Sequence, residues 1–167
     1  MKKNCVLLAA LVFSGFTFAS TNAPTVNVEW KETQNYSDIN AGRNESKRKF
    51  QKRLFSTLER TFAENSTKLP SDLTLEVTVL DIDLAGKTNG FGVRSITDYD
   101  FPAIQFYVVI KDAKGDIVLQ GLQNLKERKD KHKAFRMYGS QSEFYLETSL
   151  IEKWFDLALA PRFAKLD

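Results

Sequence analysis

The sequence has few of the residues from which most metal and nucleophile sites are built. It contains one cysteine, Cys5, and one histidine, His132, among 167 residues. Cys5 lies in a segment that we expect to be removed, so the remaining chain has no disulfide, no thiol nucleophile and no cysteine-ligated metal. His132 lies in a charged run, which offers no partner to orient an imidazole for catalysis. We therefore expect no cofactor.

Long apolar runs are also missing. The longest apolar-biased stretch, residues 5–18, has 14 residues, whereas a membrane-spanning helix needs about 20. Two lysines precede this stretch and a Thr-Phe-Ala tripeptide ends it, which is the pattern of a secretory signal peptide with small residues before the cleavage site. We interpret residues 1–19 as that signal, and residues 20–167 as one periplasmic or secreted domain without a transmembrane segment.

An excess of charge of one sign is missing too. The formal net charge is +3, and without the two lysines of the signal it falls to +1, with 22 basic against 21 acidic residues. A dedicated nucleic-acid-binding protein usually has a strong positive excess. We therefore expect no nucleic-acid partner.

The positive charge is concentrated in two clusters. Residues 43–53 hold six basic residues and one acidic residue, and residues 126–136 hold six and two. Such a cluster is ordinarily a solvated face, and contact with an anion is the functional alternative. Each Lys or Arg near an anionic membrane surface contributes about 1 kcal/mol. Candidate contacts to anionic lipid, lipopolysaccharide or an envelope protein are Arg43, Lys47, Arg48, Lys52, Arg128, Lys129, Lys131, Lys133 and Arg136.

Hydrophobic periodicity predicts six elements in the order β-α-β-β-β-α. Each strand has one apolar face and each helix one apolar stripe, so the simplest burial is an α+β two-layer sandwich. It has a four-stranded, mostly antiparallel sheet with two helices on one face. Asn44 or Ser46 is expected to cap the first helix and Pro161 to end the last, whose stripe includes Leu157. The predicted ranges are 26–30, 44–65, 73–84, 103–110, 117–125 and 142–160.

The second predicted strand has an irregular pattern. Its apolar residues are odd-numbered from Leu73 to Val79 and even-numbered from Leu80 to Leu84. A regular strand cannot change which side chains face inward. The pattern indicates a bulge near Val79, or a strand that runs past the covered region and buries its other face.

Two carboxylates in this strand suggest a second function. Asp81 and Asp83 are two residues apart, which in a strand separates their side chains by about 6–7 Å. Glycosidase-type acid–base pairs have comparable separations, and clustered oxygens also suit cations such as Ca²⁺. Salt bridges to nearby lysines or arginines are the ordinary alternative. A carboxylate-dependent hydrolase or a cation-binding protein requires a cleft beside the pair and a raised pKa for one member.

The segment Leu75 to Gly86, Leu-Glu-Val-Thr-Val-Leu-Asp-Ile-Asp-Leu-Ala-Gly, resembles the bacterial family catalogued as domain of unknown function 3016. Segments 48–58, 101–104 and 145–155 are also similar to it. The resemblance implies export from a Gram-negative-type cell and no assigned activity. Together these observations predict a non-catalytic periplasmic binding or envelope-accessory protein, rather than an enzyme.

Overall fold

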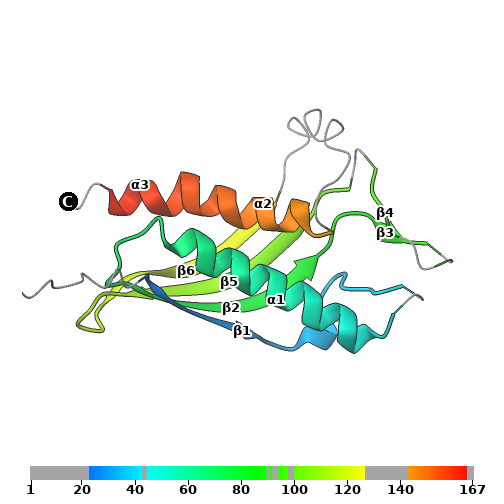
Figure 1. Ribbon diagram of the computed structural model, residues 1–167, viewed down its shortest axis with the longest axis horizontal. Helices are drawn as coiled ribbons and strands as arrows, with labels where there is room; N and C mark the ends of the chain where they lie inside the picture. The colour runs from blue at the N-terminus through cyan, green and yellow to red at the C-terminus, as the bar shows by residue number, and fades with distance from the viewer. Residues whose placement is uncertain are drawn as a thin grey trace, which may run out of the picture.

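The computed structural model describes residues 23–42, 45–89, 91, 94–97, 100–126 and 143–164. Figure 1 shows two layers, a sheet and a pair of helices that lie side by side on one of its faces. The predicted α+β sandwich is confirmed. The elements are β1 (Thr25–Trp30), η1 (Thr33–Asn35), α1 (Lys47–Ser66), β2 (Thr74–Asp83), β3 (Lys87–Thr88), β4 (Arg94–Ser95), β5 (Ala103–Lys111), β6 (Ile117–Lys126), α2 (Tyr145–Trp154), the π-helical η3 (Phe155–Leu159) and α3 (Ala160–Phe163).

The main sheet has the strand order β1-β2-β5-β6. β1 and β2 run parallel because α1 crosses over between them, and the other two pairings are antiparallel. A separate two-stranded sheet, β3–β4, projects from one end of the main sheet (Figure 1). This hairpin was not among the predicted strands, since each of its strands has only two residues.

The predicted bulge in β2 is confirmed. Val79 pairs with Phe106 and Asp81 with Gln105, so Leu80 is the extra residue. A bulge lets the strand keep one buried face on both sides of the irregularity. Val79 and Ile82 are both fully buried, whereas Leu80 is 38% exposed.

One of the two residues predicted to cap the first helix is its observed N-cap. Ser46 is the N-cap, and its Oγ accepts a hydrogen bond from the backbone N–H of Lys49 at 3.4 Å. Asn44, the other candidate, lies outside the described residues. The predicted apolar stripe of α1 lies against the sheet, with Phe50, Leu54, Leu58 and Phe62 buried.

Aromatic rings link α1, the sheet and α2 at the centre of the core. Phe62 is fully buried, and its ring meets those of Phe106, Trp154 and Phe155 edge to face, with centroids 5.5, 6.3 and 6.4 Å away. Such contacts add about 0.5–1.5 kcal/mol per pair beyond the area buried. They join elements that are distant in the sequence.

The end of the last helix differs from the prediction, because the helix continues past Pro161 to Phe163. The backbone widens into the π-helical η3, and α3 starts afresh at Ala160, so Pro161 lies in a first turn, where it has no helical N–H bond to lose. The wider turn also changes the direction of the side chains. Leu157, predicted on the apolar stripe, is 72% exposed.

Candidate functional site

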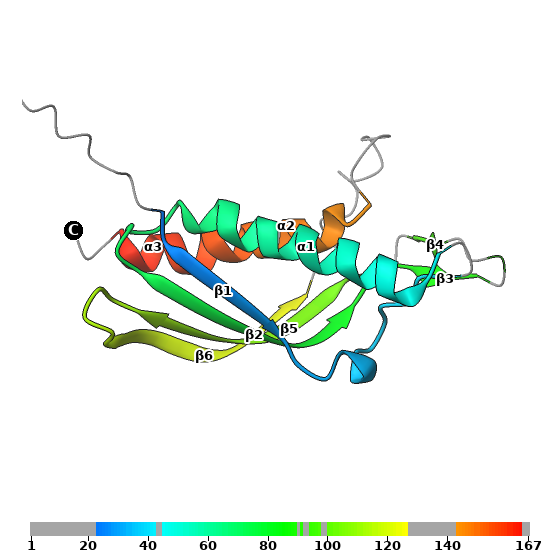
Figure 2. The same ribbon diagram turned by 60° about the horizontal axis from the view of Figure 1, so that its bottom comes forward.

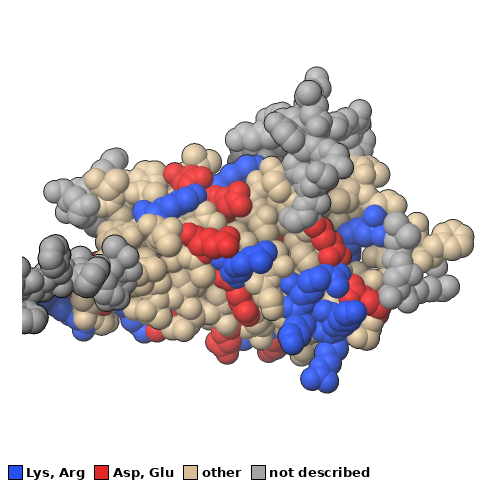
Figure 3. Space-filling model, in the orientation of Figure 1, with Lys and Arg blue, Asp and Glu red and all other residues tan. Residues whose placement is uncertain are grey.

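The basic cluster begins α1. Lys47, Arg48 and Lys49 form its first turn, Lys52 follows, and all four are exposed. The first turn has no acidic residue, although the N-terminal end of a helix carries a partial positive charge that favours acidic residues. This arrangement costs helix stability and places several cations on one surface. Blue side chains gather there in Figure 3.

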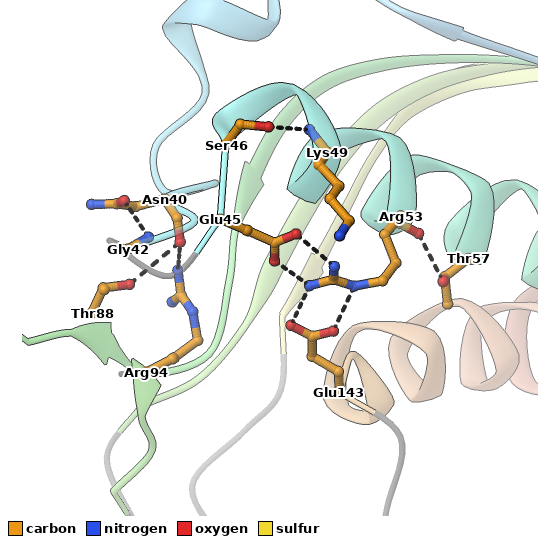
Figure 4. Close-up of polar contacts among 10 residues, drawn as sticks. All are labelled: Asn40, Gly42, Glu45, Ser46, Lys49, Arg53, Thr57, Thr88, Arg94 and Glu143. Carbon is orange, nitrogen blue, oxygen red and sulfur yellow. Dashed lines mark hydrogen bonds and ion pairs between the residues drawn. The ribbon is translucent and has the colours of Figure 1, made fainter. Parts of the chain in front are cut away.

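Arg53 belongs to the same cluster in the sequence but has a different environment. Its guanidinium donates to Glu45 at 2.7 and 2.5 Å and to Glu143 at 2.8 and 2.9 Å (Figure 4). The carbon of the guanidinium also lies 5.6 and 6.0 Å from the ring centroids of Phe50 and Phe144. Arg53 therefore connects the start of α1 to the start of α2, and its charge is neutralised.

The other cations of the cluster are available to a partner. Lys47, Arg48 and Lys52 form no ion pair with any residue that the structure describes. Hydrogen bonds from Arg53, and the charges of Arg53 and Lys49, lower the pKa of Glu45. We call the exposed cations Lys47, Arg48, Lys49 and Lys52 the basic face of α1.

Most of the second basic cluster lies outside the described residues. Lys126 ends β6 and is exposed. Arg43 of the first cluster and Arg128, Lys129, Lys131, Lys133 and Arg136 of the second lie outside the described residues. Of the predicted contact residues, those that the structure describes are Lys47, Arg48 and Lys52, and all three lie on α1.

Asp81 and Asp83 have different environments. Asp81 accepts hydrogen bonds from the backbone N–H of Ser37 at 2.6 Å and from its hydroxyl at 2.7 Å, through separate oxygens. Asp81 thereby holds the segment after β1 against β2. The pKa of Asp83 is raised by burial and by the charges of Asp38 and Asp81, and partly lowered by Lys126 and Arg94.

A polar pocket of about 520 Å³ opens beside Asp83. Because Asp83 ends β2 and Lys126 ends β6, the pocket lies where the sheet meets the β3–β4 hairpin. It has two lysines and three carboxylates in its wall. Its lining residues are Ser37, Asp38, Asn40, Asp83, Leu84, Gly86, Lys87, Thr88, Asp100, Phe101 and Lys126.

Arg94 fixes one wall of this pocket. Its guanidinium pairs with both oxygens of Asp38 at 3.1 Å and donates to the backbone carbonyls of Gly86 at 2.8 Å and Asn40 at 3.1 Å; Figure 4 shows Arg94 and Asn40. The backbone of Ser95 lies so close to position 86 that glycine is required there: φ is +77°, and a Cβ would lie 2.3 Å from the carbonyl oxygen of Ser95. Asp38 is thus held in an ion pair.

Behind the pocket lies a carboxyl group that the sequence analysis missed. Glu147 is 3% exposed, and its Oε1 accepts a hydrogen bond from the backbone N–H of Ala85 at 2.8 Å. Burial raises the pKa of Glu147, and the N–H bond partly offsets this. The available signal was its place beside Leu146 and Leu150 on the buried side of α2.

The described residues include no group of three or more histidine, cysteine, aspartate or glutamate side chains arranged to hold a metal ion. No helix within the described ranges combines the length and apolarity needed to cross a bilayer.

Comparison with protein-family models gives one match. Residues 24–157 match the model described as "Protein of unknown function (DUF3016)". The chain belongs to the DUF3016 family. Neither the curated proteins nor the solved structures contain a significant match.

Three residues near the C-terminal end of the segment that resembles the DUF3016 family can be assigned a place in the structure. In this DUF3016 protein Asp81 binds Ser37, Asp83 lines the pocket and Gly86 allows the close approach of Ser95 and Arg94. The end of the segment, from Asp83 to Gly86, therefore forms part of the pocket wall.

Proposed function

We propose that this DUF3016 protein is a non-catalytic periplasmic or secreted binding protein that contacts a phosphate-bearing anionic surface through the basic face of α1. The observation that supports this most is the exposure of Lys47, Arg48 and Lys52 without an ion pair to any described residue. Anionic lipid headgroups and lipopolysaccharide phosphates are the surfaces whose chemistry fits. An acidic envelope protein is the other partner predicted from the sequence.

The placement of these cations supports binding over simple solvation. Lysines and arginines in a first helical turn oppose the helix dipole, at about 0.3–1 kcal/mol for each charge. Acidic residues there would favour the helix, so stability alone does not account for Lys47, Arg48 and Lys49. Arg53 provides an internal comparison, because its charge is paired with two glutamates, whereas Lys47, Arg48 and Lys49, four to six residues earlier in α1, are exposed to solvent.

The test is binding to vesicles. The full chain is mixed with vesicles of zwitterionic lipid, of anionic lipid, and of lipid containing lipopolysaccharide, and bound protein is measured by sedimentation. We expect retention on anionic vesicles at low salt and loss at 0.5 M salt, where charges are screened beyond about 4 Å. Retention that is independent of vesicle charge would contradict the proposal.

A matched pair of variants assigns the surface. Reversing three charges of the basic face, K47E/R48E/K52E, is expected to weaken vesicle binding more than tenfold, since each cation contributes about 1 kcal/mol near an anionic surface. The control K31E/K114E/R162E changes net charge equally at exposed positions elsewhere, and should bind nearly as well as the parent chain. Equal losses in both variants would show that net charge alone matters.

The second candidate, a carboxylate-dependent hydrolase or cation-binding protein, retains some support. The pocket beside Asp83 and the raised pKa of Asp83 are the two features that this hypothesis requires. Both carboxylate oxygens of Asp81, however, accept hydrogen bonds from Ser37, so Asp81 and Asp83 do not act as a pair in this arrangement. Calorimetric titration with Ca²⁺ tests the cation form, with D83N expected to abolish any heat of binding and D116N, in the β5–β6 turn, to preserve it.

A further inference from the structure

The two edges of the main sheet differ in how they are protected. β1 is short, six residues, and carries Glu29. β6 is ten residues long, and residues 117–125 contain no charged residue and no proline. Natural proteins usually protect an exposed edge with charges, prolines or short strands, because its unpaired N–H and C=O groups can pair with another strand. By these criteria β6 is an unprotected edge.

On the face of the sheet away from the helices, the regular part of β6 carries Leu122 between Gln120 and Asn124. Leu122 is 50% exposed, and its register partner on β5 is Tyr107, which is 38% exposed. On the helix face, Leu119 and Leu125 are only half-buried. Trp154 of α2 contacts this face of β6, where its indole N–H donates to Gln123. Figure 2 shows β6 as the outer strand of the sheet, opposite β1. Burial on both faces of β6 is therefore incomplete.

The sequence of β6 is nearly symmetric about Leu122. In an antiparallel pair of two identical strands centred on Leu122, that residue faces its own copy. Leu119 then faces Leu125, and Gln120 faces Asn124. Apolar residues meet apolar ones and amides meet amides in these three pairs, which is the arrangement that stabilises cross-strand pairs, whereas Gly121 faces Gln123. No like charges meet within this stretch.

The bulge near the β5–β6 turn sets one limit of this pairing. Lys111 pairs with Ile117 and Ile110 with Leu119, so Val118 is the extra residue. Ile117 is odd-numbered like Leu119, yet it is 53% exposed, because the bulge turns it to the other face of the sheet. From Leu119 to Lys126 the register with β5 is regular. The symmetric segment 119–125 lies entirely within the regular part.

We propose that β6 pairs with β6 of a second copy of this chain, antiparallel and centred on Leu122, to form a two-fold symmetric dimer with a continuous eight-stranded sheet. A second copy is the occupant that fits, because the sequence matches itself at this one register, and a two-fold axis requires such self-complementarity. Pairing with an unrelated extended peptide would not require the sequence of β6 to be complementary to itself. The axis is perpendicular to the sheet, so both helix pairs lie on one side.

Sedimentation equilibrium of the full chain tests the association. We expect the mass of a dimer, with L122K raising the dissociation constant about a hundredfold or more, because two like charges would meet at the axis. The control V109K adds the same charge to the same face of the inner strand β5 and should still dimerise. Both positions are at least partly exposed, and circular dichroism verifies that each variant folds.

A cysteine at the axis tests the register. Directly opposed residues of antiparallel strands have Cα atoms about 4.5–5.5 Å apart, within the range that a disulfide spans. L122C should therefore form a covalent dimer on mild oxidation, whereas T78C, on the same face of the inner strand β2, should not. A parent chain that stays monomeric at every concentration, or a dimer unaffected by L122K, would overturn the proposal. Cross-linking by T78C to the same extent would overturn the register.

Discussion

Glu147 of α2 accepts a hydrogen bond from the backbone N–H of Ala85, at 2.8 Å and 62 residues away in the sequence. This bond connects the helix layer to the chain just beyond β2, behind the pocket that Asp83 lines. The carboxyl is almost fully buried, so it satisfies an N–H that water does not reach, and its own ionisation is opposed.

This arrangement predicts a pH dependence that one variant isolates. The pKa of Glu147 is raised in the folded state, so its contribution to stability is complete below its ordinary pKa and declines as the pH rises through the raised value. Glu147→Gln keeps an acceptor for Ala85 and has no charge to bury. In urea unfolding, the free energy of unfolding of E147Q should increase relative to that of the parent chain as the pH rises above 4.5. The variant E147L lacks the acceptor and should be less stable than the parent chain by about 1–3 kcal/mol below pH 4.5, and this difference should shrink as the pH rises and Glu147 ionises in the parent chain.

The link between Glu45 and Arg53 predicts the opposite trend. Hydrogen bonds from Arg53 lower the pKa of Glu45, so the stabilisation is present above the ordinary carboxyl pKa and is lost as the pH falls through the lowered value. Arg53→Lys removes the fork that holds Glu45 and Glu143 together. Thermal melts at pH 7 and pH 3 should differ less for R53K than for the parent chain. If the melting temperature changes equally between pH 7 and pH 3 in both proteins, Arg53 does not stabilise the ionised form of Glu45.

The basic face of α1 predicts an opposition between stability and binding. Replacing Lys47 and Arg48 by glutamate places acidic residues in the first turn, which the helix dipole favours by about 0.3–1 kcal/mol per charge. K47E/R48E should therefore melt at a higher temperature than the parent chain while binding anionic vesicles more weakly. The pair K114E/R162E, away from the start of α1, should leave vesicle binding nearly unchanged and should not raise the melting temperature, because Arg162 lies in the last turn of α3, where the helix dipole favours a cation. A lower melting temperature for K47E/R48E would contradict the dipole argument.

The hydroxyl of Tyr36 predicts a small and specific loss. It donates to the backbone carbonyl of Val79 at 3.0 Å, and burial, followed by the charge of Asp81, raises the pKa of Tyr36 to about 12. The carbonyl of Val79 also accepts from the N–H of Lys31 at 3.2 Å. Tyr36→Phe therefore leaves this acceptor satisfied and should cost only about 0.5–1.5 kcal/mol.

Spectrophotometric titration provides the second measurement for Tyr36. A phenol whose pKa is raised in the folded state stabilises the fold fully below pH 10, and this stabilisation is lost as the pH rises through 12. The parent chain should thus keep one more tyrosine un-ionised near pH 11 than Y36F, until it unfolds. A larger absorbance change at pH 11 in the parent chain than in Y36F would show that the hydroxyl is not protected.

Sequence patterns over a few neighbouring residues correctly predicted the bulge in β2 and the cap of α1. The change of parity between Val79 and Leu80 indicated the bulge that the register confirms, because side-chain alternation in a strand leaves no other regular solution. Ser46 was one of two predicted caps and is the cap observed. Pro161 misled the prediction, because the π-helical turn before it moves proline into a new first turn.

The candidate site was only partly predictable. The basic face of α1 follows from adjacent residues in the sequence, so its exposure could be anticipated. The ion pair between Asp38 and Arg94, and the neutralisation of Arg53 by Glu45 and Glu143, depend on segments that meet only after folding. Periodicity carries no information on such partners.

By itself, the sequence determined the two-layer fold and the basic start of α1, since hydrophobic burial acts on each element according to its own period. Only the tertiary structure decided which charged groups form ion pairs and which are exposed to solvent. Arg53 is paired with two glutamates, while Lys47 and Arg48 face solvent. Charge pairing depends on distances of a few ångströms between distant parts of the chain, and those distances are set by packing.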